Sequence, residues 1–354
     1  MRILLLTRYG RMGASSRVRT YQYIPYLKSF GFEVTQAPLF DDKYIERLYS
    51  DAHRSLLRII SSYLKRIIVL LNSSKYDLLW IEKELFPWLP NWGELILSGK
   101  RVPYLVDYDD AVYHRYDSHP NYLIRRLLGN KISNIMHSAS CVVTGNEYLA
   151  EYARRAGAKR IEIIPTVVDL NLYSFPFPIQ KVSKTDFTIG WIGSPITSRY
   201  LKIIESALIE ICKNGRTKIV IIGSDKIKIN DVNLETRQWN ENREVEELKK
   251  IDVGIMPLPD NLWERGKCGY KLVQYMACYK PVVASPVGIN RTLVSHGKDG
   301  FLASNANEWI SALKSLRENA KLRKNMGLAG RRKVEKKYCV QVRISKLVEI
   351  LLSL

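Results

Sequence analysis

Short apolar runs alternate with longer segments of helical period along the first half of the chain. The run at residues 2–7 (RILLLT) precedes a segment of helical apolar spacing that ends at Gly31. The other short runs of this half occur at residues 32–40, 76–83, 102–110, 140–146 and 160–169. Strands that alternate with helices in this way predict βαβ units and a parallel sheet.

A turn-rich segment with two prolines, at residues 171–186, interrupts this pattern, and the alternation then starts again. The apolar runs of the second half occur at residues 187–194, 217–225, 232–239, 252–258 and 280–288, before a helical tail. Because one core rarely exceeds about 250–300 residues, we expect two domains in this chain. They are an N-terminal Rossmann-like domain at 1–175 and a second one at 176–330, with a closing helix at 331–354. The predicted fold class is α/β, with two doubly wound domains facing a cleft at the carboxyl ends of their strands.

The charge balance points to an anionic partner. The 354 residues include 55 Lys and Arg against 35 Asp and Glu, a formal net charge of +20. The excess occurs in both halves rather than in a basic tail, so it belongs to folded surfaces. Such a balance is typical of proteins that bind nucleic acid, acidic lipid headgroups or phosphate-bearing substrates. The chain has no motif typical of nucleic-acid binding, and we expect no nucleic-acid partner.

Cysteine spacing and hydropathy limit the expected location. Five widely spaced cysteines without a C-x-x-C pair disfavour a zinc site or a disulfide framework and favour a reducing cytosol. The N-terminal apolar run is too short for a signal peptide, and no uncharged apolar window reaches the roughly 18 residues of a membrane span. We therefore expect a cytoplasmic protein, either soluble or peripheral on the inner face of the membrane.

Several glycines follow predicted strands, where phosphate-binding turns occur. Gly13 comes after the first strand, and Gly193–Ser194 and Gly223–Ser224 follow two strands of the second half. None forms G-x-G-x-x-G, and G-x-x-x-x-G-K-[ST] is missing, which disfavours a dinucleotide dehydrogenase and a P-loop kinase. Close packing or a positive φ explains any single glycine equally well. Together they indicate a nucleotide phosphate site in the predicted cleft.

The segment ERGKCGYK, residues 264–271, carries the clearest phosphate-binding chemistry. Gly266 and Gly269 allow backbone N–H groups to approach an anion at the start of the following helix. Lys267 and Lys271 are four residues apart and, if helical, share one side and supply cationic donors to a diphosphate. The alternative is a surface turn with solvated lysines. Three less polar residues interleave with these charges, which such a turn does not need: Trp263, Cys268 and Tyr270.

The segment from Tyr275 to Asn290, YMACYKPVVASPVGIN, resembles the nucleotide-sugar site of the family-4, or group 1, retaining glycosyltransferases of the GT-B fold. Residues 163–173 (IIPTVVDLNLY), 189–195 (IGWIGSP) and 252–258 (DVGIMPL) are similar to other landmarks of that family, in the same order. The resemblance implies that the second domain binds a nucleoside diphosphate-sugar and the first meets the acceptor. It also implies that the closing helix packs back on the first domain. Uridine diphosphate-sugars are the favoured donors, and no cofactor is expected.

The sequence departs from the E-x7-E pair of that family. Gln274 stands where the second glutamate is expected, and Gly266 falls at the place of the first. The family implies that the second position binds the ribose hydroxyls, a role that Gln274 can fill as a neutral donor and acceptor. The first position is expected near the donor sugar. Glu264, the nearest acid, is therefore a candidate catalytic residue.

The family's cationic pair on the diphosphate is also displaced. Ser194 occupies the usual arginine position, so Arg199 is expected to supply one charge and Lys267 or Lys271 the other. The reaction would release a nucleoside diphosphate from an anomeric carbon through an oxocarbenium-like transition state. Fixed cations and helix N-termini stabilise the charge that develops on the leaving phosphate, so no metal ion is expected.

A second group of acids follows a strand of the first domain. In VDYDDAVYH, residues 106–114, Asp107, Asp109 and Asp110 superficially resemble a D-x-D metal-binding element. They are distant in sequence from the donor lysines, so we expect Asp109 and Asp110 to orient an acceptor hydroxyl or the donor sugar. They are candidate catalytic residues. The alternative is that they cap the next helix.

Residues 44–74 predict a helix with a cationic stripe on one side and a broad apolar face on the other. Four basic residues fall within a narrow arc at 100° per residue: Arg47, Arg54, Arg58 and Lys65. This pattern suits a helix on an anionic membrane surface, and it equally suits a surface helix docked on its own sheet. The net charge favours membrane contact, which implies a lipid-linked glycan acceptor and a role in polysaccharide biosynthesis. Arg11, Arg17 and Arg19 are then candidates for an acceptor phosphate, unless Arg17 and Arg19 pair with acids.

Three other functions stay open. A nucleotide-sugar epimerase would share the architecture but need no second substrate. A non-catalytic partner subunit would explain the altered E-x7-E pair. A nucleic-acid-binding module would need a basic groove with interleaved aromatic residues. A glycosyltransferase fits the charges, the glycines and the family landmarks together.

Overall fold

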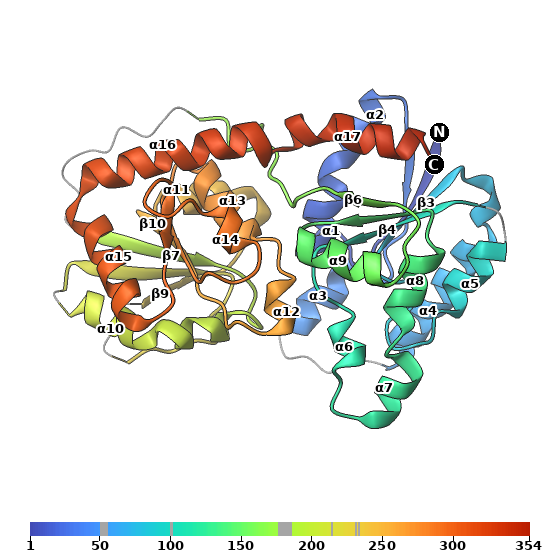
Figure 1. The fold of residues 1–354 in the computed structure, drawn as a ribbon, viewed down its shortest axis with the longest axis horizontal. Coiled ribbons are helices and arrows are strands. Elements are labelled where there is room, and N and C mark those ends of the chain that lie inside the picture. Colours follow the sequence, from blue (N-terminus) through green and yellow to red (C-terminus); the bar gives the residue numbers. More distant parts are fainter. Residues whose placement is uncertain (50–55, 100–101, 176–185, 214, 231, 233) are drawn as a thin grey trace. The chain divides into compact units, whose positions relative to one another are not determined.

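The computed structural model describes residues 1–49, 56–99, 102–175, 186–213, 215–230, 232 and 234–354. The chain forms two compact units (Figure 1). Unit 1 comprises Met1–Thr166, Arg265–Cys268 and Arg343–Leu354, and unit 2 comprises Val167–Glu264 and Gly269–Val342. Each unit is therefore assembled from segments that are separated in the sequence.

Unit 1 contains a six-stranded parallel sheet in the order β2-β1-β3-β4-β5-β6. Its strands are β1 (Arg2–Leu6), β2 (Glu33–Gln36), β3 (Leu78–Glu82), β4 (Tyr104–Tyr108), β5 (Cys141–Thr144) and β6 (Ile161–Ile163). All residues of β3, β4 and β5 are buried, as in parallel sheets whose two faces are covered. Strand order reverses between β1 and β3. The carboxyl ends of these two strands flank the switch point, where open α/β sheets bind ligands.

Helices connect these strands, and two of them begin at an asparagine that caps the first turn. The Oδ1 atom of Asn121 accepts the Leu123 N–H at 2.8 Å, and that of Asn146 accepts the Leu149 N–H at 3.0 Å. The helices of unit 1 are α1 (Ala14–Arg19), α2 (Ile24–Ser29), α3 (Asp42–Tyr49), α4 (Leu56–Leu71), α5 (Trp92–Gly99), α6 (His114–Asp117), α7 (Tyr122–Leu128), α8 (Lys131–Ser138) and α9 (Glu147–Arg155). Within the helical stretch expected at 44–74, the structure thus describes α3 and α4.

Unit 2 contains a second six-stranded parallel sheet, in the order β12-β11-β10-β7-β8-β9. Its strands are β7 (Phe187–Ile192), β8 (Thr217–Ile222), β9 (Leu234–Arg237), β10 (Val253–Met256), β11 (Val282–Ala284) and β12 (Gly300–Leu302). Its helices are the 3-10 helix η3 (Ser198–Ile204), α10 (Glu205–Cys212), α11 (Glu244–Lys249), α12 (Leu262–Arg265), α13 (Tyr270–Ala277), α14 (Asn290–Leu293), α15 (Ala306–Glu318) and α16 (Ala320–Lys337), of which α12 ends in unit 1. The order reverses between β7 and β10, which is the Rossmann arrangement.

The last helix, α17 (Val340–Leu352), begins in unit 2 and continues into unit 1. The part of α17 in unit 1 forms an ion pair with β6, the edge strand of the first sheet, where the Lys346 Nζ lies 2.8 Å from the Glu162 carboxylate. Arg160 donates a hydrogen bond of 2.7 Å to the Ser353 hydroxyl, just after the helix. Leu347 and Ile350 are buried.

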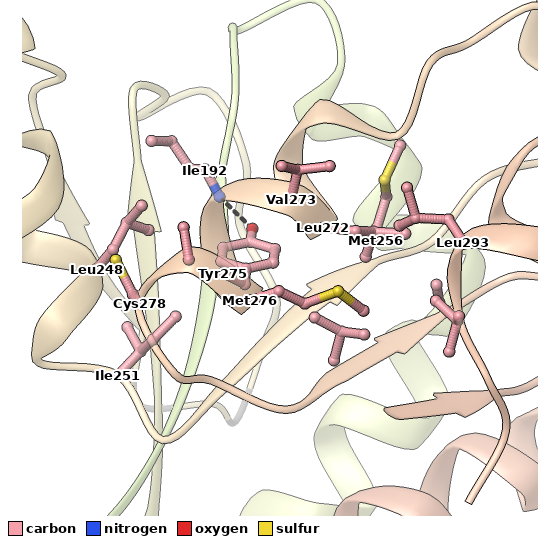
Figure 2. Packing of buried hydrophobic residues seen from close by; sticks show 14 of the residues in the cluster. Ile192, Leu248, Ile251, Met256, Leu272, Val273, Tyr275, Met276, Cys278 and Leu293 are labelled. Carbon is pink, nitrogen blue, oxygen red and sulfur yellow. Dashed lines mark hydrogen bonds between the residues drawn. The ribbon is translucent and has the colours of Figure 1, made fainter. Parts of the chain in front are cut away.

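The core of unit 2 fixes the position of α13. Figure 2 shows the Tyr275 ring among Leu248, Ile251 and Cys278. The Ile192 N–H, at the end of β7, donates a hydrogen bond of 2.9 Å to the Tyr275 hydroxyl. A Cβ on Gly254 of β10 would lie 2.2 Å from this ring, so the ring needs a glycine beneath it. These contacts hold the helix at the carboxyl end of β7.

The predicted α/β class with two parallel, doubly wound sheets is confirmed. The alternating pattern predicts such sheets because each strand is buried on both faces and each connection is helical. Among the described helices, none combines the length and the apolar character needed to cross a lipid bilayer.

Candidate functional site

Two glycines meet at the carboxyl ends of β7 and β8 in unit 2. Gly193 follows β7, and its N–H donates a hydrogen bond of 3.0 Å to the Ile222 carbonyl. Gly223 follows β8 with φ +92°, and a Cβ at this position would lie 2.4 Å from the Gly193 carbonyl oxygen. Only glycine fits this backbone. Ser194 and Ser224 come directly after these glycines, so the predicted donor residues of these two turns lie next to each other.

The N-terminus of α13 opens at the same edge of the sheet. Gly269 precedes the helix with φ +68°, in the left-handed region that favours glycine. Lys271 lies in the first turn, and its Nζ is 3.9 Å from the centroid of the Trp191 ring. A Cβ on Gly193 would lie 2.2 Å from this Nζ, so the ammonium occupies the space beside the end of β7. A cation, a helix N-terminus and a glycine turn together suit an anionic phosphate.

Gln274 takes part in a buried polar network. Its amide nitrogen donates a hydrogen bond of 2.6 Å to Glu244 Oε1, and Trp239 Nε1 donates one of 2.6 Å to Glu244 Oε2. Gln274 is 2% exposed and Glu244 9% exposed. The neutral residue of the altered pair therefore lies against a carboxylate from α11. Nothing in the sequence distinguishes Glu244 from Glu246 and Glu247, which lie in the same helix.

The remaining donor-side candidates of unit 2 lie around η3. Glu264 is buried and accepts a hydrogen bond from the Tyr200 hydroxyl. Arg199 is exposed, with its guanidinium 5.4 Å from the centroid of the Tyr200 ring. Ser194 Oγ is 3.4 Å from Thr197 Oγ1. Tyr200 thus lies between a buried acid and a surface cation, and it had no sequence signal of its own.

Residues 265–268 belong to unit 1, whereas Gly269, Tyr270, Lys271 and Gln274 belong to unit 2. Lys267 precedes α13 and is not helical, so the two lysines do not share a helix face as they would in a continuous helix. The amide of Asn146 donates hydrogen bonds of 3.0 and 3.1 Å to the carbonyls of Gly266 and Lys267. The sequence places this segment next to α13, but the fold joins it to the ends of β4 and β5.

Close packing explains the small residues of this segment. A Cβ on Gly266 would lie 2.8 Å from the Ala111 nitrogen, and one on Gly145 would lie 2.2 Å from Cys268 Sγ. The Cys268 thiol donates to the Asp109 carbonyl at 3.1 Å. Burial raises the pKa of Cys268 to about 12, helped by the charges of Asp109 and Asp110, so it is a packing residue rather than a nucleophile.

Lys83 connects the two candidate catalytic aspartates of unit 1. Its Nζ lies 2.8 Å from Asp109 Oδ1 and 3.7 Å from Asp110 Oδ2, and it donates a hydrogen bond of 3.1 Å to Ser15 Oγ. Lys267 approaches Asp110 from the other segment, with its Nζ 3.5 Å from Oδ1. Burial alone would raise the pKa of Asp109, but the charges of Lys83 and Arg19 outweigh it and hold the pKa below its ordinary value.

The backbone at Lys83 is strained. Its φ is +65°, and the Glu84 N–H donates a hydrogen bond of 2.7 Å to the Glu82 carbonyl around it. This is a γ-turn with a positive central φ, a rare and costly conformation for a residue with a side chain. It sends the Lys83 side chain to the aspartates at the end of β4. In the sequence, the triplet EKE is typical of solvated surface, so Lys83 was missed.

The flanking glutamates are buried with partners of their own. Glu82 Oε2 accepts the Ser16 hydroxyl at 2.6 Å and the Arg8 N–H at 2.8 Å. Glu84 Oε2 lies 2.6 Å from the Lys131 Nζ, and this cation contributes to holding the pKa of Glu84 below its ordinary value against the effect of burial. Charged side chains thus surround the switch point of unit 1.

The arginines expected at an acceptor phosphate lie after β1, in different environments. Arg19 is 2% exposed and forms a bidentate pair with Asp107, with N···O distances of 2.8 and 3.1 Å. A phosphate could reach it only by breaking this pair. Arg17 is buried and donates to the Arg11 carbonyl at 3.2 Å, whereas Arg11 itself is exposed. Gly13 is the N-cap residue of α1. A Cβ on Gly13 would lie 2.5 Å from Tyr9 Cβ.

The basic residues expected at a membrane fall on α3 and α4. Arg47, Arg58 and Lys65 are exposed, and Arg54 lies outside the described residues. Arg66, which has no place in the predicted stripe, is buried and donates hydrogen bonds of 2.7 and 2.9 Å to the carbonyls of Thr7 and Ala37. These hydrogen bonds attach α4 to the segments that follow β1 and β2 of the sheet.

Comparison with known proteins finds a family match within the second half of the chain. Residues 186–319 match the family model of the glycosyl transferases, group 1. The chain therefore carries a glycosyltransferase domain, which spans the glycine turns, η3, Glu264 and α13. No curated protein matches the chain.

Solved structures of low sequence identity share the fold over the whole chain. The Anabaena protein Alr3699/HepE, in complex with UDP-glucose, has a TM-score of 0.73 at 17% identity, with 100% of both chains covered. Sucrose-phosphate synthase from Thermosynechococcus elongatus has a TM-score of 0.73 at 14% identity, covering 100% of this chain and 98% of its own. The α,α-trehalose 6-phosphate synthase from Burkholderia multivorans has a TM-score of 0.67 at 12% identity, covering 99% of this chain and 98% of its own. The fold is that of the GT-B glycosyltransferases.

Proposed function

We propose that the protein is a family-4, retaining glycosyltransferase that uses a uridine diphosphate-sugar and needs no metal ion. The observation that carries the proposal is the arrangement of Lys271, Gly193 and the N-terminus of α13 inside the domain that matches the group 1 glycosyltransferases. The UDP and UDP-glucose complexes of the Anabaena protein support the choice of donor.

In this proposal unit 2 holds the donor. The ammonium of Lys271 and the N–H groups at the start of α13 stabilise the charge that develops on the leaving diphosphate. Glu244 and Gln274 together replace the second glutamate of the E-x7-E pair at the ribose hydroxyls. The carboxylate comes from α11, and the amide orients it through the 2.6 Å hydrogen bond.

Asp109 and Asp110 act on the acceptor side, and the charges around Asp109 make it a poor general base. An inverting enzyme needs a general base whose pKa lies near the working pH. The pKa of Asp109 is instead held below its ordinary value, so its carboxylate is a weak base. It is suited to accept a hydrogen bond from a hydroxyl. In the retaining reaction the acceptor oxygen bonds to the anomeric carbon as the diphosphate departs, and the acceptor proton passes to the leaving phosphate oxygen.

The acceptor is proposed to be a lipid-linked glycan, with the protein peripheral on the inner face of the membrane and active in polysaccharide biosynthesis. The net charge of +20 and the exposed basic residues Arg58 and Lys65 of α4 support this class of acceptor. Arg11 is the exposed candidate for its phosphate.

Calorimetry with UDP and a turnover assay test the proposal. Because a hydrogen bond to a charged group is worth about 1.5–3 kcal/mol, Lys271→Ala should weaken UDP binding by about ten- to a hundredfold. Lys213→Ala, an exposed lysine paired with Glu210 in the same unit, is the matched control. Wild-type UDP affinity in Lys271→Ala would remove the donor assignment.

Turnover separates the enzyme classes. Release of UDP that depends on an added polyprenyl diphosphate glycan supports a transferase, and conversion of the nucleotide-sugar without an acceptor indicates an epimerase. The anomeric configuration of the product, measured by NMR, decides between retention and inversion. A lack of turnover with every donor, in protein that binds UDP, would indicate a partner subunit.

A further inference from the structure

Exposed apolar side chains concentrate on one part of unit 1. Of the twenty-two large hydrophobic residues that are exposed in the described chain, fourteen lie between Leu56 and Leu127, in α4, α7 and the segment 88–96. Leu57 is 80% exposed, Leu127 73% and Trp92 62%. Scattered single residues of this kind are normal on a soluble surface, but such a concentration marks an interaction site.

Contacts within unit 1 connect these segments to one another. The Tyr63 hydroxyl of α4 donates a hydrogen bond of 2.6 Å to the Pro87 carbonyl, which joins α4 to the residues before Trp88. The Trp88 ring lies edge-on to Tyr116 and His119, at centroid distances of 5.5 and 5.9 Å, next to α7. Helix α4 also packs on α5, and α6 on α7 (Figure 1). We call the exposed apolar residues of α4, segment 88–96 and α7 the apolar surface.

Trp88 is held in this surface at a conformational cost. Its φ is +65°, a region that bulky residues rarely adopt, and its side chain is 47% exposed. The Trp88 N–H donates a hydrogen bond of 3.1 Å to the Tyr116 hydroxyl, which fixes the turn. The fold therefore places a tryptophan ring partly in solvent and holds its backbone in a conformation of higher free energy than an ordinary negative φ.

The exposed charged residues within these three segments have one sign. The exposed charged residues are Arg58 and Lys65 on α4 and Arg125 and Arg126 on α7. Residues 56–71, 85–99 and 122–128 contain one acid, Glu94, and it is buried. A second copy of the chain is a poor occupant, because a symmetric contact would bring the same cations together. Apolar residues with tryptophans and a basic rim complement an anionic lipid surface.

We infer that the apolar surface inserts into the headgroup region of an anionic phospholipid bilayer. Trp88 and Trp92 lie at the level of the headgroups, Leu57 and Leu127 enter the acyl boundary, and the arginines contact lipid phosphates. The inference extends the proposed peripheral location from one helix to a defined surface. It needs only unit 1, and so it does not depend on the catalytic assignment.

Flotation with vesicles tests the inference. The full chain should float with vesicles of phosphatidylglycerol and phosphatidylcholine at low salt, bind pure phosphatidylcholine about tenfold more weakly, and lose part of its binding at high salt. Leu123→Glu combined with Leu127→Glu should reduce binding by about tenfold or more. Leu172→Glu combined with Ile203→Glu, at exposed apolar positions of unit 2, is the matched control and should float like the wild type.

Two further measurements identify the occupant. Brominated lipids should quench tryptophan emission, and less so in a protein with Trp88→Phe and Trp92→Phe. Equal flotation with neutral and anionic vesicles, unchanged flotation of the α7 variant, or a dimer that the α7 variant abolishes would overturn the inference. UDP binding measured without vesicles keeps the two proposals apart, since the apolar surface stands if vesicles bind but UDP does not.

Discussion

Gln274→Glu would place a glutamate where the glycosyltransferases that this segment resembles carry one, and we expect it to harm this protein. The amide nitrogen that now donates to Glu244 Oε1 at 2.6 Å would become a carboxylate oxygen facing another carboxylate. At that separation and an effective dielectric constant of about 20, two unit charges repel by about 6 kcal/mol. The pair would avoid this cost by keeping one proton, so one of its two pKa values would rise well above the ordinary glutamate value.

The destabilisation should therefore grow with pH. In the unfolded chain both glutamates titrate near 4.3, so retaining a proton in the folded state costs about 1.4 kcal/mol for each pH unit above that value. This amounts to about 1 kcal/mol at pH 5 and approaches about 5 kcal/mol at pH 8. Because this pKa is higher in the folded than in the unfolded variant, the free energy of unfolding of the variant falls as pH rises. The stability of the variant is therefore closest to that of the wild type in acid.

Urea unfolding of the variant at pH 5 and pH 8 measures these two values. The swap Gln274→Glu with Glu244→Gln restores one amide and one carboxylate, and it should recover most of the loss and UDP binding as well. Equal stability of the wild type and the single variant at pH 8, or a swap no better than the single variant, would refute the reasoning.

Four further predictions concern buried residues of the two units. Lys83→Met removes the counterion of the buried Asp109, so it should lower the free energy of unfolding by about 3–5 kcal/mol above pH 7. Because burial then raises the pKa of Asp109, urea unfolding should show a smaller loss toward pH 5. The same substitution in Asp109→Asn protein should show little pH dependence. Lys83→Gly relieves the positive φ and should be less destabilising than Lys83→Met by about 1 kcal/mol, whereas equal losses would show that the γ-turn stores no strain. Gly254→Ala places a methyl group against the Tyr275 ring and should lower the free energy of unfolding by about 1–3 kcal/mol, and an unchanged thermal midpoint would contradict the close approach of Gly254 to this ring. The Cys268 thiol, whose pKa is about 12, should resist iodoacetamide at pH 8 in the folded protein and react after unfolding, as mass spectrometry can show.

The alternation of apolar runs and helical segments was enough to predict the two parallel sheets, because each buried strand leaves a local signal. The glycine turns at Gly193 and Gly223 were also visible, since a close backbone approach requires glycine. Partners far apart in the chain could not be matched in this way. The sequence allowed Arg19 to pair with an acid, but it could not single out Asp107, which is 88 residues away.

Lys83 and Glu244 show a second limit of the sequence. Both stand among other charged residues, where exposure is the ordinary outcome, and only the fold buries them. The γ-turn at Lys83 depends on the strand end and on Asp109, which are fixed by tertiary packing. Gln274 was identified from its position, but the reason for a neutral residue there became clear only with Glu244 beside it.

The division of the chain has a consequence for synthesis in the cell. Unit 1 begins at Met1, yet it takes Arg265–Cys268 and Arg343–Leu354 from much later in the sequence. A ribosome, which adds about 5–20 residues per second, therefore makes the last helix of unit 1 only after every strand of unit 2. Until then the surface that receives Leu347 and Ile350 stays uncovered, while the strands of unit 2 are already complete. The nascent N-terminal part has to wait for its own final segment, and a fragment that stops at residue 175 would remain in that unfinished state.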